Sequence, residues 1–213
     1  MRYKAILFDM DGTLLDTLTD MADAVNHILS VHGWPLRTTE EVRAFVGNGA
    51  RRLMERAVPP EVTDGDFEAV LTEYRDWYQT HNCVATAPYP GIPALLAALA
   101  KAGIKTAVVS NKPDATTKTL AARFFPGLPA FGQRDDVPPK PAPDLVFRAL
   151  ETLGVDAADA IYVGDSEVDV ATARNAGLPL AAVSWGFRGR RALPEAGAAV
   201  IVDTAAGPLE VLR

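Results

Sequence analysis

Two aspartates, Asp9 and Asp11, stand in the segment Asp-Met-Asp-Gly-Thr directly after a short apolar run. A carboxylate can attack phosphorus to give an aspartyl phosphate, which divides one slow displacement into two easier steps. Asp9 is placed for that attack, while Asp11 could protonate the leaving oxygen and then deprotonate the water that cleaves the intermediate. Gly12 permits a sharp turn that points amide hydrogens at phosphate oxygens, and the Thr13 hydroxyl adds a donor. The motif predicts phosphoryl transfer, although paired aspartates can also simply cap a helix.

A second acidic motif begins at Asp165 and ends at Asp169, again after an apolar run. Magnesium prefers hard oxygen ligands and usually takes one or two protein carboxylates beside phosphate and water. Asp9 and Asp165 could supply those carboxylates, whereas Asp169 would hold a bound water or orient a neighbouring lysine. The alternative is that the motif is an acidic helix start, stabilised by the helix dipole.

Two further stretches offer groups for the phosphate itself. Ser110 and Asn111 follow a strand pattern, where a hydroxyl and neighbouring backbone amides could hold a phosphate oxygen. Lys140 lies between two prolines, which restrict the backbone and so limit where the ammonium can go. A fixed cation there would offset repulsion between the aspartates and a phosphate dianion. A plain turn and a solvated lysine are the alternatives.

The elements that must position these residues alternate between strand and helix. Five apolar runs that lead into polar residues predict buried parallel strands, at 4–8, 104–109, 160–163, 180–183 and 198–202. Helical patterns lie between them, at 92–102, 115–125, 143–153 and 168–176. This alternation predicts an α/β fold, a Rossmann-like doubly wound parallel sheet whose ligands bind beyond the carboxyl ends of the strands.

Residues 16–84 interrupt this alternation. They show amphipathic helical patterns and no clear strand, with helices expected at 21–31, 40–46, 50–58 and 67–80. Pro88, Pro90 and Gly91 then mark the return to the sheet. We therefore expect a catalytic core made of residues 1–15 and 85–213, with residues 16–84 inserted as a helical cap domain.

Composition narrows the partners and the compartment. With a formal charge of −6, the 213-residue chain lacks the clustered lysine and arginine of a nucleic-acid-binding or anionic-membrane surface. No apolar stretch approaches the ~20 residues of a transmembrane helix. One cysteine and no secretory signal pattern predict a cytoplasmic protein. The expected partner is a small-molecule phosphate ester, and the pattern leaves monomer and homodimer open.

In this order, Asp-x-Asp-Gly-Thr, strand-Ser, Lys-Pro and Gly-Asp-x₃-Asp, the motifs resemble those of the haloacid dehalogenase superfamily across nearly the whole chain. The resemblance implies a Rossmann-like core, a helical cap and Mg²⁺ as cofactor. It also implies Asp9 as nucleophile and Asp11 as acid and base, with Ser110 and Lys140 on the phosphate. Metal ligands would be Asp9, Asp165 and, through its backbone carbonyl, Asp11.

Within that superfamily, residues 46–53, the Ser-Asn-Lys segment and the segment 140–144 resemble bacterial phosphoglycolate phosphatases. Arg51 or Arg52 could meet a substrate carboxylate, and the glycines around Asn48 could let the backbone approach it. Both arginines could equally be exposed charges on an amphipathic helix. The segment 185–189 departs from the tyrosine-containing version of those enzymes. The resemblance thus favours 2-phosphoglycolate among several small phosphate esters.

The fate of the aspartyl phosphate separates the remaining alternatives. Attack by water makes the chain a phosphatase, whereas attack by a sugar hydroxyl makes it a phosphotransferase of the β-phosphoglucomutase type. A phosphatase releases inorganic phosphate and a mutase does not. A binding module that merely keeps the fold is disfavoured because Asp9 and Asp11 are both present. A dehalogenase is disfavoured because that chemistry dispenses with the second aspartate.

Overall fold

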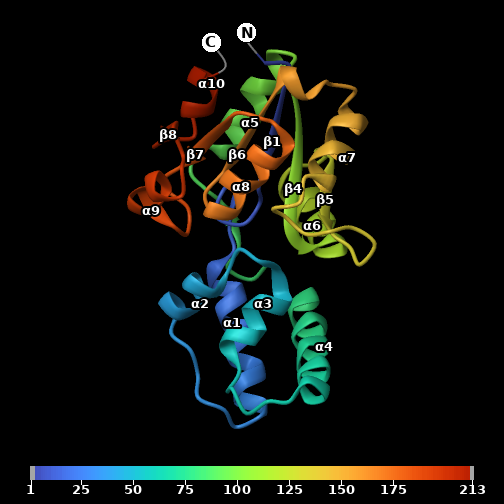
Figure 1. Ribbon diagram of the computed structural model, residues 1–213, viewed down its shortest axis with the longest axis vertical. Coiled ribbons are helices and arrows are strands. Elements are labelled where there is room, and N and C mark those ends of the chain that lie inside the picture. The colour runs from blue at the N-terminus through green and yellow to red at the C-terminus, as the bar shows by residue number, and fades with distance from the viewer. Residues whose placement is uncertain (1–2, 212–213) are drawn as a thin grey trace.

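A six-stranded parallel sheet in the order β5-β4-β1-β6-β7-β8 forms the centre of the larger lobe in the computed structural model, which describes residues 3–211 (Figure 1). The strands are β1 (Ala5–Phe8), β4 (Lys105–Pro113), β5 (Ala130–Gln133), β6 (Ala160–Gly164), β7 (Leu180–Val183) and β8 (Ile201–Val202). β1 pairs with β4 on one side and β6 on the other. The first strand of the chain is therefore central.

Both faces of the sheet are covered, because alternate side chains of a strand point to opposite faces. Ile6 and Phe8 pack in one apolar cluster with residues of α5 and α6, while Ala5 and Leu7 pack in another with residues of α7 and α8. The helices are α5 (Ile92–Lys101), α6 (Asp114–Phe124), α7 (Asp144–Leu153), α8 (Glu167–Ala176), α9 (Gly189–Glu195) and α10 (Gly207–Val211), with a short 3₁₀ turn at Ala157–Asp159. This is the predicted doubly wound α/β core.

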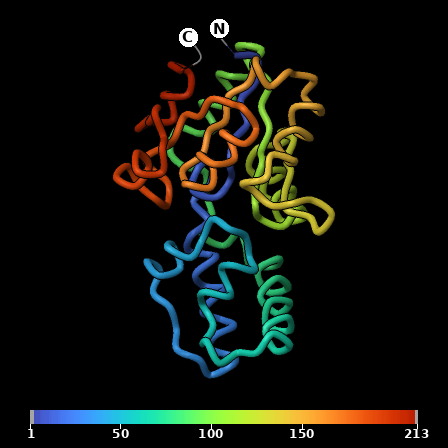
Figure 2. The backbone as a smooth tube through the Cα atoms, in the orientation of Figure 1, coloured from blue at the N-terminus to red at the C-terminus, as the bar shows by residue number. Residues whose placement is uncertain are grey.

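The smaller lobe is helical. It consists of α1 (Leu18–Val31), α2 (Thr39–Phe45), α3 (Gly49–Ala57) and α4 (Asp64–His81), which share an apolar cluster of their own. Figure 2 shows this lobe joined to the core by two chain crossings, one entering α1 and one returning after α4. The helical cap is thus present, and the division at residues 16 and 84 stays a prediction.

The two crossings are tied to each other. β2 (Leu15–Asp16) pairs antiparallel with β3 (Ala87–Pro88). Beside them Asp20, only 2% exposed, accepts three hydrogen bonds from the backbone N–H groups of Val84, Ala85 and Thr86, at 3.0, 2.8 and 2.9 Å. One buried carboxylate on α1 therefore accepts hydrogen bonds from three consecutive backbone N–H groups of the segment that returns to the core.

The sequence-based elements agree with the structure at the strands and helices that carry the motifs. Three differences have physical causes. β2, β3 and β5 were not predicted: β2 and β3 have two residues each and leave no periodic signal, and the four residues of β5 include polar Gln133 and a glycine and do not form an apolar run. The last strand covers only Ile201–Val202 instead of 198–202, because Ala198 packs under α9. α9 and α10 were not predicted, and both are short. Within residues 3–211 no helix is long and apolar enough to cross a bilayer.

Replacing Asp20 by alanine should lower the free energy of unfolding by about 2–4 kcal/mol, because three backbone N–H groups lose a buried, charged acceptor. Urea denaturation followed by circular dichroism measures the loss. Asp23→Ala is the matched control, since Asp23 is an exposed residue of the same helix. Equal stability of the two variants would contradict the assigned role of Asp20.

Candidate active site

Three neighbouring strands bring the predicted motifs to one edge of the sheet. Asp9 follows β1, Ser110 lies on β4 and Asp165 follows β6, and these strands are adjacent in the sheet. A cavity of about 150 Å³ lies there, between the core and the cap. From the core it is lined by Asp9, Asp11, Ser110, Asn111, Lys112, Lys140, Asp165, Phe187 and Arg188, and from the cap by Met21, Gly47, Ala50, Leu53, Tyr74, Arg75, Tyr78 and Gln79.

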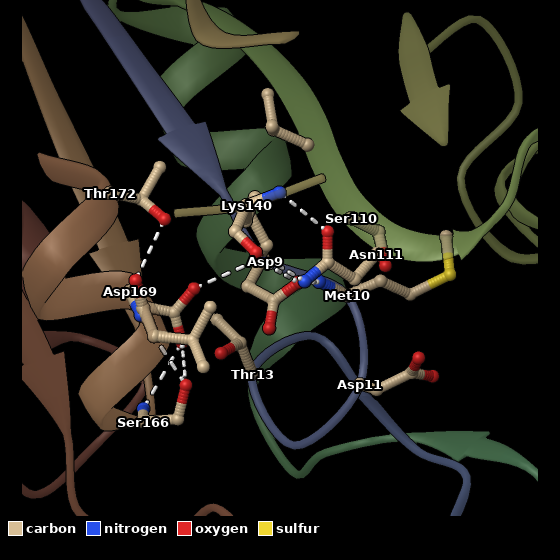
Figure 3. A network of polar contacts seen from close by, with 12 residues as sticks. Asp9, Met10, Asp11, Thr13, Ser110, Asn111, Lys140, Ser166, Asp169 and Thr172 are labelled. Atoms are coloured by element: carbon tan, nitrogen blue, oxygen red, sulfur yellow. Dashed lines mark hydrogen bonds and ion pairs between the residues drawn. The ribbon is translucent and has the colours of Figure 1, made fainter. Parts of the chain in front are cut away.

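The Asp9 carboxylate is held through one of its two oxygens. Oδ1 accepts a hydrogen bond from the Met10 backbone N–H at 2.7 Å and lies 2.9 Å from Nζ of Lys140 (Figure 3). No described residue donates a hydrogen bond to Oδ2. The group is thus fixed in orientation and keeps one oxygen available to a ligand in the cavity.

Asp169 is occupied on both oxygens. Oδ1 lies 2.9 Å from Nζ of Lys140, and Oδ2 accepts hydrogen bonds from the N–H groups of Asp165 and Ser166 and from the Ser166 hydroxyl. The Ser166 side chain in turn accepts a bond from the Asp169 backbone, which completes a capping box at the start of α8. Asp169 therefore contacts Lys140 and holds the backbone of the Asp165 loop, and its predicted role in orienting the lysine or a bound water stays a prediction.

Lys140 is the counter-charge of this cluster. Its Nζ, on a residue 3% exposed, contacts Asp9, Asp169 and the Tyr162 hydroxyl, the last at 3.1 Å. Burial alone would lower the pKa of Lys140, but the carboxylates of Asp169 and Asp9 raise it well above its ordinary value. The lysine is therefore a permanent cation.

One lysine does not balance the carboxylates around it. Oxygens of Asp9, Asp165 and Asp169 all lie within 4.8 Å of one another, and all three residues are buried. Burial, followed by repulsion from neighbouring aspartates, raises the pKa of Asp165 well above its usual range. Burial likewise raises the pKa of Asp9 to about 7, although Lys140 opposes the rise. Such a donor set, hard oxygens short of positive charge, fits a divalent cation.

Close packing fixes Asp165 against the first motif. Its Oδ2 accepts a hydrogen bond from the Phe187 backbone at 2.7 Å, and the Thr13 hydroxyl donates to Oδ1 at 3.4 Å. Gly12 has φ of 83°, and a Cβ added there would lie 2.5 Å from Oδ2 of Asp165. A Cβ added at Gly186 would lie 2.3 Å from the Cβ of Asp165. Both glycines are needed for the two acidic segments to approach.

Asp11 points away from the cluster formed by Asp9, Lys140 and Asp169 (Figure 3). Its Oδ1 accepts a hydrogen bond from the Thr17 hydroxyl at 2.7 Å and lies 3.1 Å from Nζ of Lys112. The carboxylate of Asp11 is not part of the group of oxygens that could hold a cation. It does line the cavity, on the side toward the cap.

Ser110 and Asn111 have different surroundings. The Ser110 hydroxyl accepts a hydrogen bond from the Lys112 backbone at 3.1 Å and faces the cavity. The Asn111 side chain holds the backbone of Lys140 from both sides, through bonds of 2.8 and 3.0 Å, and also donates to the Gly47 carbonyl of the cap at 3.2 Å. Phosphate binding by Asn111 stays a prediction; its observed contacts position Lys140.

The two predicted cap residues do not line the cavity. Arg51 is about half exposed and pairs with Glu68 at 2.7 Å, on the outer side of the helices. The side-chain oxygen Oδ1 of Asn48 accepts a hydrogen bond from the Arg56 guanidinium at 3.1 Å. Their assignment to the substrate stays a prediction that these contacts do not support, because each side chain already has a partner elsewhere.

Sequence reasoning missed the residues that join core to cap. Arg188 pairs with Glu167 at 2.8 Å and donates to the carbonyls of Arg43 and Val46 at 3.0 and 2.6 Å. Lys112 donates to the hydroxyl of Tyr78, a cap residue, at 2.8 Å. The position of Lys112 next to the predicted site residue Asn111 could have indicated that it lies at the site. Arg188 lies in the loop after β7, and that position is a weaker indication of a functional residue.

Comparison with known proteins agrees with this geometry. The family model for haloacid dehalogenase-like hydrolases matches residues 6–183. N-acetylmuramic acid 6-phosphate phosphatase of Pseudomonas aeruginosa is 36% identical over the whole of this chain and 96% of its own. A plasmid-encoded phosphoglycolate phosphatase of Cupriavidus necator is 37% identical over 94% of this chain and 89% of its own.

Solved structures give the same grouping. A crystal structure from Lactobacillus delbrueckii subsp. bulgaricus, assigned provisionally as a phosphoglycolate phosphatase, superposes with a TM-score of 0.94 at 37% identity, covering 100% of this chain and 99% of that one. CbbY of Rhodobacter sphaeroides, crystallised in complex with phosphate, has a TM-score of 0.75 at 28% identity, covering 96% and 95% of the two chains. The similarity extends over the cap as well as the core.

Proposed function

Because this chain belongs to the haloacid dehalogenase-like hydrolase family and is a phosphoric monoester hydrolase, we propose that its substrate is 2-phosphoglycolate and that Asp9 is its nucleophile. The observation that carries the mechanistic part is the asymmetric Asp9 carboxylate, whose Oδ1 is held by Met10 and Lys140. The free Oδ2 is the oxygen that can reach phosphorus.

In the first step, Oδ2 of Asp9 attacks phosphorus as the bond from phosphorus to the ester oxygen breaks. The leaving oxygen takes a proton from Asp11, which gives glycolate and an aspartyl phosphate. In the second step, Asp11 takes a proton from a water molecule whose oxygen attacks the same phosphorus. The bond to Asp9 breaks, inorganic phosphate leaves, and both carboxyl groups return to their starting states.

The remaining residues hold the phosphate and exclude water. The Ser110 hydroxyl and the Lys140 ammonium would bind phosphate oxygens, with Gly12 and Thr13 shaping the turn beside them. Lys140 is preorganised by Asp169 and by the backbone clamp from Asn111, so it need not reorganise during the reaction. The cap closes the cavity on the side opposite the sheet.

Asp9 and Asp165 would hold Mg²⁺, with the Asp11 backbone carbonyl as the further ligand that the family resemblance implies. When bound, the ion supplies positive charge that offsets repulsion between the carboxylates and a phosphate dianion. This chain's own contribution is to keep the two carboxylates buried and fixed, through the Phe187 backbone and the Thr13 hydroxyl on Asp165.

The size of the cavity favours a small substrate. Pockets that bury drug-sized ligands are commonly ~300–1,000 Å³, whereas this one is about 150 Å³. A two-carbon phosphate ester suits that space better than an amino sugar phosphate. N-acetylmuramic acid 6-phosphate is the second candidate, because a phosphatase named for it is 36% identical over this entire chain.

A panel of esters tests the substrate assignment. We expect kcat/KM for 2-phosphoglycolate to exceed that for N-acetylmuramic acid 6-phosphate, glucose 1-phosphate and nucleoside monophosphates by at least about tenfold. Inorganic phosphate release measures each rate. A higher kcat/KM for N-acetylmuramic acid 6-phosphate would refute the assignment, and isomerisation of a sugar phosphate without phosphate release would mean a mutase.

Asp9→Asn should abolish phosphate release while leaving the fold intact, because an amide is nearly isosteric with the carboxylate but is a poor nucleophile. We expect a loss of at least roughly 10³-fold in kcat, with an unchanged circular dichroism spectrum. Asp23→Asn, an exposed position in the cap, is the control. Wild-type turnover in Asp9→Asn would exclude the aspartyl phosphate.

Magnesium should stabilise the protein as well as activate it. At 100 times its dissociation constant, an ion that binds only the folded state contributes about 2.7 kcal/mol, which corresponds to a rise in Tm of roughly 5–10 °C for a chain of this size. The increase should disappear in Asp165→Asn and remain in Asp23→Asn. Phosphate release should stop in EDTA and resume with excess Mg²⁺; activity that survives thorough chelation would contradict the site.

A further inference from the structure

Lys112 is a buried cation for which the proposed mechanism has no use. The residue is 5% exposed and lines the cavity. Its Nζ lies 3.1 Å from Oδ1 of Asp11 and donates to the Tyr78 hydroxyl at 2.8 Å. Lysine is rarely buried to this extent without a reason, because removing an ammonium group from water is costly.

The ammonium group of Lys112 is not fully occupied. It has three donor hydrogens, and its contacts among the described residues account for two of them, to Asp11 and to Tyr78. Asp11 already shares the same oxygen with the Thr17 hydroxyl. One donor of Lys112 therefore remains for a group that enters the cavity.

The position of Lys112 indicates which part of the substrate could accept its remaining hydrogen bond. Asp9 would attack phosphorus and Asp11 would protonate the ester oxygen, so the path from Asp9 to Asp11 follows the bond that breaks. Lys112 contacts Asp11 and also lines the cavity, so its ammonium group adjoins the place where the leaving group must lie. A substituent on the carbon that carries the ester oxygen would thus lie against this ammonium group.

Resting on the function proposed above, we propose that Lys112 is the specificity-determining residue that binds the substrate's carboxylate. It selects phosphate monoesters that carry an anionic group one carbon from the ester oxygen. The pairing is charge-assisted and lies in a buried site, where such bonds are strong. Tyr78 fixes the ammonium from the cap side, so the carboxylate is recognised when the cap covers the cavity.

The other cations at the cavity are less suited to this task. Lys140 is held between Asp9 and Asp169 and is the cation already assigned to the phosphate oxygens. Arg188 is engaged by Glu167 and by two cap carbonyls. Arg75 lines the cavity but is exposed, so its charge is screened by water. Lys112 alone among these combines burial with a spare donor.

The test compares two esters of equal chain length, 2-phosphoglycolate and 2-hydroxyethyl phosphate, in which a neutral hydroxymethyl group replaces the carboxylate. In Lys112→Met, which keeps an apolar stem of similar length, kcat/KM for 2-phosphoglycolate should fall roughly 10- to 100-fold. The value for 2-hydroxyethyl phosphate should fall at least about tenfold less, because any loss transmitted through Asp11 is shared by both esters whereas loss of the carboxylate contact is not. Lys118→Met is the control, because Lys118 is an exposed lysine on α6.

Binding is measured separately from turnover in an Asp9→Asn background. Isothermal titration calorimetry should show that Lys112→Met weakens the binding of 2-phosphoglycolate and leaves the affinity for 2-hydroxyethyl phosphate nearly unchanged. An equal loss for both esters would overturn the inference and make Lys112 a positioning residue for Asp11. If the wild type released phosphate from neither ester, the proposed function would fail, while the two titrations would still decide the role of Lys112.

Discussion

The structure depends on holding negative charge together where it would otherwise repel itself. Asp9, Asp165 and Asp169 are buried within 4.8 Å of one another, with one buried lysine to balance them. Repulsion in such a site is strong because little water screens it. Backbone N–H groups that donate to the carboxylates of Asp9, Asp165 and Asp169 offset this repulsion. β1 also lies between β4 and β6 in the sheet, which fixes the backbone that leads into Asp9. The unbalanced charge that remains is what makes the site receptive to a cation.

The need to balance these carboxylates also explains why residues of the sheet and of the flanking loops must hold Lys140 in place. Lys140 can serve two carboxylates only if its backbone is fixed, and Asn111 fixes it with two hydrogen bonds from the neighbouring strand. Asp169 can orient that lysine only if α8 begins directly after Ser166, which the capping box ensures. Residues far apart in sequence are therefore coupled through hydrogen bonds, and each one limits the freedom of the next.

Much of this could be predicted from the sequence because strand ends of a parallel sheet meet at one edge. The apolar runs before Asp9, Ser110 and Asp165 were sufficient to place those residues together, and the helical patterns of residues 16–84 predicted the cap, which the family resemblance also implies. Side-chain partners were not predictable. Arg51 pairs with Glu68, and Asn111 turns to Lys140, because those contacts depend on helix orientation and loop geometry that no local pattern encodes. Arg188 was missed because it reaches the cap from a loop without periodicity.

The contacts between the lobes come chiefly from core side chains. Arg188 donates to the carbonyls of Arg43 and Val46, and Asn111 donates to that of Gly47. Backbone carbonyls are present whatever residues occupy the cap, so the cap sequence can change without losing these bonds. The exception is Tyr78, whose hydroxyl meets Lys112. Substrate selection can therefore lie partly in the core, where Lys112 beside Asp11 would bind the leaving group. The cap would mainly contribute apolar residues that line and cover the cavity.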